Sequence, residues 1–111
     1  SSRVIDELIK ATKEFDYAIL VLTPDDFVKK RGIEQFAPND NVILEIGIFM
    51  GTLGINRTFM IYPEGVQLLL PSDLDGLLKM KFQCPSENKF LRASVGPACT
   101  SMLEIIQKQN Q

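Results

Sequence analysis

The sequence contains no histidine. This absence excludes Ser-His and Cys-His nucleophiles, histidine-ligated metal sites and the most common general base. Every apolar run is shorter than the roughly 18 residues that span a bilayer, and the first residues lack the pattern of a signal peptide. The net charge of −2 leaves no basic surface for nucleic acid. We therefore expect a cytoplasmic protein that binds neither membrane nor nucleic acid.

Cysteine is also scarce. Cys84 and Cys99 are the two cysteines, and a pair without a secretion signal is more often free than bonded. With so few ligands of the histidine and cysteine type, we expect no metal site. Of the 111 residues, 45% are apolar and 23% are charged, which is typical of a globular protein with a single core. We expect one domain over residues 1–111.

Hydrophobic periodicity predicts helices that alternate with short strands. Apolar residues recur at helical spacing near the start, in the middle and at the end of the chain. Between these segments lie short apolar runs rich in residues that favour strands. The predicted helices are 2–12, 40–53, a single turn within 71–76, and 94–108, and the predicted strands are 17–23, 57–62 and 77–82. The polar stretch 25–38 is interpreted as a surface loop.

The strand at 17–23 decides the fold class. It is apolar almost throughout, so we expect both of its faces to be covered, as in a parallel sheet flanked by helices. Alternating helices and strands then predict an α/β fold built from right-handed crossovers. A doubly wound domain usually has about five or six strands. The predicted sheet is therefore incomplete, and this strand is expected to have an open edge.

The helix at 40–53 carries a carboxylate, Glu45, inside an apolar run. Glu45 lies at the edge of the apolar face that contains Val42 and Ile46. Burying an unpaired charge is costly, so Glu45 either pairs with a cation or a backbone amide or serves chemistry. The residues alone leave both readings open. On the opposite side, Gly47 and Gly51 predict that another element packs closely.

Three segments resemble one known family. They are DYAILVLTPDD at 16–26, NVILEIGIFMGTLG at 41–54 and LPSDLDG at 70–76. Taken in this order, they resemble the bacterial TIR-like domains, a family of predicted nucleotide-binding proteins. These domains occur in anti-phage defence effectors, including fusions to cyclic-dinucleotide sensors. The resemblance covers almost the whole chain, and its most specific part is the Asn-Val-Ile-x-Glu-x-Gly segment around Glu45.

The resemblance implies a three-layer flavodoxin-like (TIR-like) fold with a parallel sheet of about three strands and four helices, N-terminally incomplete in this chain. A strand, a helix, a second strand and a nucleotide-contacting loop that family members carry before the first helix are not found here. The implied activity is that of an NAD+ nucleosidase, which cleaves the nicotinamide-ribose bond and forms ADP-ribose or a cyclised product. NAD+ is then the substrate, no cofactor is needed, and the catalytic glutamate of the family falls on Glu45.

The resemblance also implies partners. TIR domains commonly assemble with copies of themselves, so self-association through TIR-TIR contacts is expected. A cyclic-dinucleotide sensor domain in the same protein is the second expected partner, and it would carry the activating signal.

Three further residues are candidates for binding the substrate. Asp25 and Asp26 follow the first strand, at the end where open α/β sheets bind ligands, although acidic residues also serve turns. Asn41 lies one helical turn before Glu45 and could orient it. Asn39 and Asp40 are interpreted as the helix cap rather than as ligand contacts.

Two alternatives to a catalytic domain remain. A non-catalytic TIR-like module would bind a nucleotide or assemble with copies of itself. A flavodoxin-like receiver or scaffold is the weaker alternative. A receiver needs a phosphorylatable aspartate after its first strand, an acidic pair before it and a later lysine, and this set is not found in the sequence.

Overall fold

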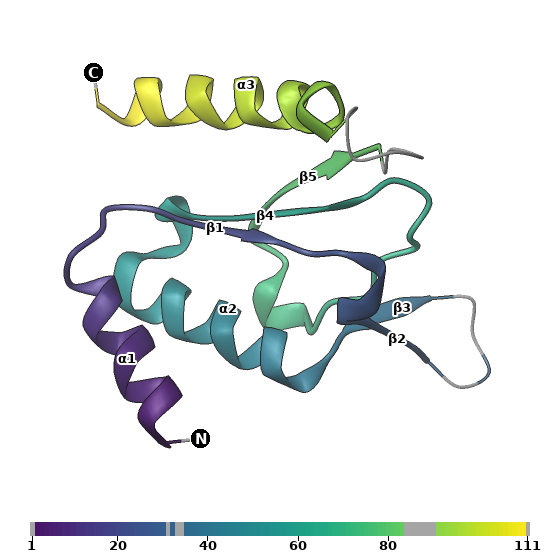
Figure 1. The fold of residues 1–111 in the computed structure, drawn as a ribbon, viewed down its shortest axis with the longest axis horizontal. Helices are drawn as coiled ribbons and strands as arrows, with labels where there is room; N and C mark the ends of the chain where they lie inside the picture. Colours follow the sequence, from purple (N-terminus) through teal and green to yellow (C-terminus); the bar gives the residue numbers. More distant parts are fainter. Residues whose placement is uncertain (1, 31, 33–34, 84–90, 111) are drawn as a thin grey trace.

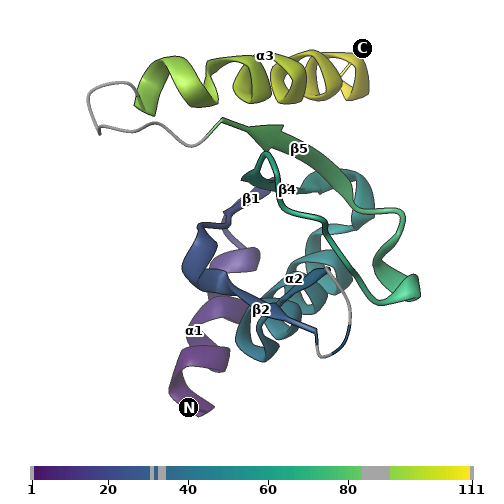
Figure 2. The same cartoon turned by 90° about the vertical axis from the view of Figure 1, so that its right-hand side faces the viewer.

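A three-stranded parallel sheet lies between helices on its two faces (Figure 1). The computed structural model describes residues 2–30, 32, 35–83 and 91–110. The strands, in their spatial order, are β1 (Ala18–Val21), β4 (Thr58–Pro63) and β5 (Leu78–Phe82). The helices are α1 (Ser2–Thr12), α2 (Asp40–Leu53) and α3 (Leu91–Gln109). Helices α1 and α2 lie on one side of the sheet and α3 on the other (Figures 1 and 2), so the predicted three-layer α/β fold is confirmed.

The central strand β4 joins the two halves of the core. All six of its residues are buried, and successive side chains point to opposite faces of the sheet. Met60 and Tyr62 pack with the α2 residues Val42 and Ile46. On the other face, the described core residues are Phe59, Ile61, Phe82, Ala98 and Met102, the last two from α3. Helix α2 is therefore held against the sheet by its own apolar face.

The first strand is covered on one face, so the prediction that both faces are buried is wrong. Leu20 and Leu22 are buried on the α2 side, whereas Ile19 is 48% exposed and Val21 is 55% exposed. Within the described part of the chain, β1 pairs with β4 alone, and α3 packs over β4 and β5. The open edge predicted for this strand is thus confirmed among these residues.

The segment predicted as a loop, 25–38, contains regular structure. A 3-10 turn, η1 (Pro24–Asp26), is followed by an antiparallel hairpin of β2 (Phe27–Lys29) and β3 (Phe36–Pro38). The sequence pattern did not indicate these strands, because each has three residues and charged residues lie next to the hairpin in the sequence. Backbone bonds tie the hairpin to the rest of the domain: the Phe36 N–H donates to the Gln67 carbonyl at 2.8 Å, and the Leu69 N–H donates to the Phe36 carbonyl at 2.8 Å.

Helix α2 begins and ends where the sequence predicts. Asn39 is the N-cap, and its Oδ1 accepts the Val42 N–H at 3.0 Å. Gly54 ends the helix at φ 101°, a backbone conformation that favours glycine. The close packing predicted at Gly47 and Gly51 is wrong within the described residues, because both are exposed and a Cβ at either position would meet no atom within 4 Å.

The remaining elements agree with the predicted order. The single turn within 71–76 is a 3-10 helix, η3 (Ser72–Leu74), and a similar turn, η2 (Ile55–Arg57), precedes β4. Helix α3 begins a few residues earlier than predicted and contains Pro97. Cys99 is a free, exposed thiol on α3, whereas Cys84 lies outside the described residues. In the parts of the chain that are described, no helix is long and apolar enough to cross a membrane.

Candidate functional site

Glu45 lies in the wall of a cavity of about 450 Å³ beside the open edge of β1. Cavities of this size, about 300 to 1,000 Å³, bind small molecules in other proteins. The cavity is formed between α1, β1, α2 and the 3-10 turn that follows β1. Its lining residues are Leu8, Ile19, Leu20, Val21, Leu22, Asp26, Asn39, Asn41, Val42, Glu45 and Phe49.

The rotation of α2 places Glu45 at this position. Val42 and Ile46 are buried against the sheet, and Ile46 is 0% exposed. Glu45 precedes Ile46 by one residue, about 100° around the helix, and so lies at the boundary of the buried face. Asn41 is one turn before it and Phe49 one turn after it, and both line the same cavity. The position of Asn41 one turn before Glu45, expected from the helical period, therefore brings both residues to the same cavity.

The side chain of Glu45 is half-buried. Among the described residues it forms no hydrogen bond or ion pair. An acid placed for stability would accept hydrogen bonds or meet a cation, because partial burial without a partner costs free energy. The sequence left open a structural role in which Glu45 pairs with Lys, Arg or a backbone amide. The described residues contain no such pair. The Glu45 carboxylate faces a cavity that can hold a ligand.

The three other candidates lie in different environments. Asn41 is exposed at the surface of α2 and lines the cavity with Glu45. Asp26 is half-buried, also lines the cavity, and accepts hydrogen bonds from Thr23. Asp25 is exposed and lies outside the residues that form the cavity wall. The fold thus brings Asp26 and Asn41 to Glu45 and leaves Asp25 apart.

The apolar part of the site was missed by sequence reasoning. Leu8 from α1 and the exposed side chains of Ile19 and Val21 from β1 form one side of the cavity. In the sequence, Ile19 and Val21 belong to a continuous apolar run. Such a run does not reveal which face of the strand lacks a covering helix. The cap residue Asn39 also reaches the cavity wall, in addition to its predicted role at the start of α2.

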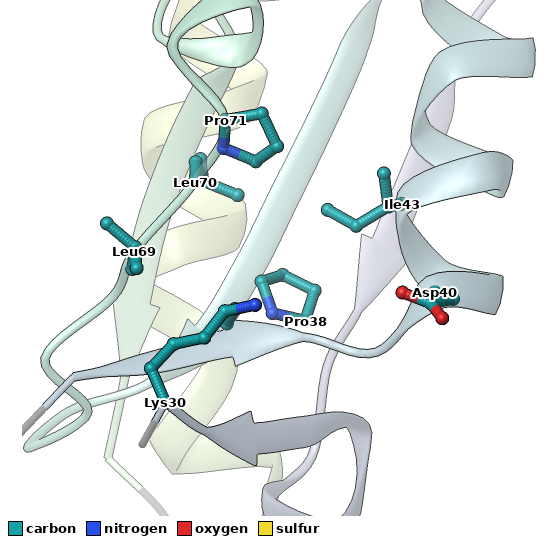
Figure 3. Close-up of a pocket in the computed structure, with 8 residues that line it drawn as sticks. Lys30, Pro38, Asp40, Ile43, Leu69, Leu70 and Pro71 are labelled. Carbon is teal, nitrogen blue, oxygen red and sulfur yellow. The ribbon is translucent and has the colours of Figure 1, made fainter. Parts of the chain in front are cut away.

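A second cavity, of about 380 Å³, lies on another side of α2 (Figure 3). Ile43 and Asp40 of α2 face Leu69, Leu70 and Pro71 across it, and Lys30 extends along its edge beside Pro38 (Figure 3). Its walls are mainly apolar, and its one carboxylate, Asp40, is in the first turn of α2. Asp40 and Lys30 carry opposite charges. This cavity therefore offers an apolar surface without an excess of either charge.

The described side chains do not favour a metal centre. No group of three or more Cys, Asp or Glu residues in the ranges given above is arranged to hold a metal ion. The larger cavity suits a ligand that develops positive charge next to the Glu45 carboxylate.

Comparison with known proteins gives the same family that the three sequence segments indicate. Residues 1–84 match the family described as CAP12/Pycsar effector protein, TIR domain. The Pycsar effector protein PaPycTIR of Pseudomonas aeruginosa is 38% identical over 108 residues, which are 97% of this chain and 35% of that protein. The Pycsar effector protein XpPycTIR of Xanthomonas perforans is 39% identical over 106 residues, 96% of this chain and 35% of that protein.

A third relative carries the other family name. CD-NTase-associated protein 12 of Sphingobacterium faecium is 44% identical over 78 residues, which are 70% of this chain and 24% of that protein. This chain therefore spans at most about a third of the length of these curated relatives. The family match covers most of the chain and includes α1, β1, α2, β4 and β5. The chain belongs to the TIR-domain family of the CAP12 and Pycsar effector proteins.

Proposed function

We propose that this chain is the catalytic TIR domain of an NAD+ nucleosidase, which cleaves the bond between nicotinamide and ribose. The observation that carries the proposal is the half-buried carboxylate of Glu45, which has no partner in the described ranges and lies in the wall of a cavity large enough for part of a nucleotide. The resemblance of the surrounding segment to the catalytic segment of TIR-like domains supports the same residue.

The reaction suits a site in which one carboxylate, that of Glu45, acts without a histidine. When the glycosidic bond breaks, its electron pair leaves with nicotinamide, which changes from a cationic ring to a neutral one. No general acid is needed for this departure. The ribose carbon becomes oxocarbenium-like, and a nearby anion stabilises the charge that develops there. Water then adds to this carbon and releases a proton, so that the products are nicotinamide, ADP-ribose and a proton.

The walls of the cavity contribute to this chemistry in two ways. The apolar side chains of Leu8, Ile19 and Phe49 line the cavity that contains Glu45, and a carboxylate acts more strongly on a charge where apolar groups lower the local dielectric constant. Asn41 can donate a hydrogen bond from its amide to a ribose hydroxyl or to Glu45 itself. Asp26 lines the same wall, where its carboxylate accepts hydrogen bonds from Thr23. The exposed Asp25 is proposed only as a contact for parts of the dinucleotide that extend out of the cavity.

The relatives suggest the biological setting. Their names describe effector proteins and a protein associated with a CD-NTase. By analogy, the protein that carries this domain is an anti-phage effector in which NAD+ loss stops the infected cell. A cyclic-nucleotide sensor in the same protein and contacts between TIR domains would switch the site on. The non-catalytic alternative keeps the same cavity for nucleotide binding or assembly without cleavage.

One experiment separates these functions. The full-length protein in which this domain occurs is incubated with NAD+, with and without cyclic-nucleotide activators, and nicotinamide release is followed. We expect Glu45→Gln, which keeps the shape of the side chain and removes its charge, to lower kcat by about 100-fold or more. Glu64→Gln is the matched control because Glu64 is an exposed acid directly after β4. Release unaffected by Glu45→Gln contradicts the assigned role, and no release with any activator favours the binding module.

A further inference from the structure

The carboxylate of Asp26 is engaged by the turn in which it lies. Its Oδ2 accepts the Thr23 N–H at 2.7 Å and the Thr23 hydroxyl at 3.3 Å. The Asp26 N–H in turn donates to the Thr23 carbonyl at 2.9 Å. These bonds close the 3-10 turn η1 onto Thr23, which follows Leu22, the buried residue directly after β1. The side chain therefore has a structural task in addition to its place in the cavity wall.

The main chain of Asp26 extends this connection to α2. Its carbonyl accepts the Asn39 N–H at 2.8 Å. Asn39 is the cap of the helix: its Oδ1 accepts the Val42 N–H at 3.0 Å, and its carbonyl accepts the Ile43 N–H at 3.0 Å. A continuous set of hydrogen bonds thus runs from the carboxyl end of β1, through Asp26, to the first turn of the helix that carries Glu45.

The far end of β1 is itself fixed to the sheet. The Leu22 N–H donates to the Ile61 carbonyl at 2.9 Å, so the start of the turn is tied to the buried central strand β4. Glu45 lies six residues after Asn39, about 9 Å along the helix axis at 1.5 Å per residue. Small rotations of the first turn of α2 therefore move the Glu45 carboxylate relative to β1, which forms another wall of the cavity.

We propose that Asp26 is a positioning residue for Glu45. Through its carboxylate and carbonyl it joins Thr23 to the Asn39 cap, and this connection fixes α2 against the end of β1. The proposal rests on the proposed function and refines it, because it assigns Asp26 to the alignment of the catalytic carboxylate rather than to the substrate. Misplacement of a reacting group by about 1 Å can lower a rate by about 100-fold, so such a connection matters for catalysis.

The two roles of Asp26 predict different behaviour of Asp26→Asn and Asp26→Ala. An asparagine keeps an oxygen that can accept the Thr23 N–H and loses the negative charge. If Asp26 positions Glu45, Asp26→Asn retains kcat and KM within about threefold, whereas Asp26→Ala lowers kcat about 10- to 100-fold and leaves KM within about threefold. If Asp26 binds the cationic substrate through its charge, both variants raise KM and asparagine does not rescue alanine.

Amide hydrogen exchange tests the connection without reference to activity. In the full-length Asp26→Ala protein, we expect the Val42 and Ile43 amides to exchange about 5- to 30-fold faster, as for the loss of a helix cap. The amides of β4 are expected to keep their protection, and Asp26→Asn and the control Glu64→Ala are expected to match the wild type. Glu64 is suitable as a control because it is exposed and lies outside the cavity lining.

The combined outcomes decide the proposal. Faster exchange confined to the start of α2, together with rescue by asparagine, supports it. Unchanged exchange in Asp26→Ala overturns it, as does a KM increase shared by both variants. If the wild-type protein releases no nicotinamide, the proposed function fails, and the exchange data alone then decide whether Asp26 holds the start of α2.

Discussion

Replacement of Ile46 by alanine tests how α2 is seated under the site. The Ile46 side chain is 0% exposed and packs in the cluster that contains Met60, Tyr62 and Leu77. Ile46→Ala removes three carbon groups worth about 0.8 kcal/mol each, or about 2.4 kcal/mol in total. The cavity left behind adds to this value, so we expect a loss of about 3 to 4 kcal/mol in the free energy of unfolding of the domain. This is a large part of the 5 to 15 kcal/mol that is typical of a whole domain, taken as a rough range.

Exchange of the β4 amides measures this loss inside the full-length protein. These amides lie in the buried central strand, so their exchange reports opening of the domain as a whole. A loss of about 3 kcal/mol speeds exchange by about 100-fold. Leu44→Ala is the matched control on the same helix because Leu44 is 50% exposed, and we expect a change of less than about 0.5 kcal/mol. Equal effects of the two substitutions would refute the assignment of the buried face of α2, and with it the placement of Glu45 at the boundary.

The remaining predictions concern α2 and the segment that follows it. Gly47→Ala is expected to stabilise the domain by about 0.5 to 1 kcal/mol, since the new methyl group meets open space in a helix interior, and thermal melting would show the gain. Gly54→Ala is expected to destabilise it by about 1 to 3 kcal/mol because φ is 101°, and a melting temperature at or above that of the wild type would contradict this account. Thr58→Val is expected to lower the free energy of unfolding by about 1 to 3 kcal/mol, because the fully buried Thr58 hydroxyl donates to the Gly54 carbonyl at 3.0 Å. Denaturant unfolding measures the change. Thr52→Val, on the exposed side of α2, is the control.

The sequence predicts the order and type of the main elements because their apolar residues follow regular periods. The run at 17–23 and the alternation before Phe82 indicate strands, and Asn39 and Gly54 mark the ends of α2. It fails for the hairpin β2–β3, whose strands are three residues long and are stabilised by backbone bonds to Gln67 and Leu69. Such contacts join segments about thirty residues apart, and no local pattern encodes them.

The candidate site was predicted in part, for a similar reason. Glu45 and Asn41 share a helix face, so their proximity follows from the helical period. Burial of β1 could not be predicted correctly, because a continuous apolar run is the same whether one face or both are covered. The hydrogen bonds of Asp26 were equally invisible, since an acid after a strand can face a ligand or close its own turn.

The most direct test of the account compares the Glu45→Gln protein with the wild type in two measurements on the same samples. Binding of NAD+ gives Kd, and nicotinamide release under saturating NAD+ gives kcat. The account predicts that kcat falls by about 100-fold or more while Kd stays within about threefold, because the carboxylate acts on the charge that develops during bond breaking. A kcat within about tenfold of the wild type, at unchanged Kd, would contradict the claim that Glu45 is the catalytic carboxylate.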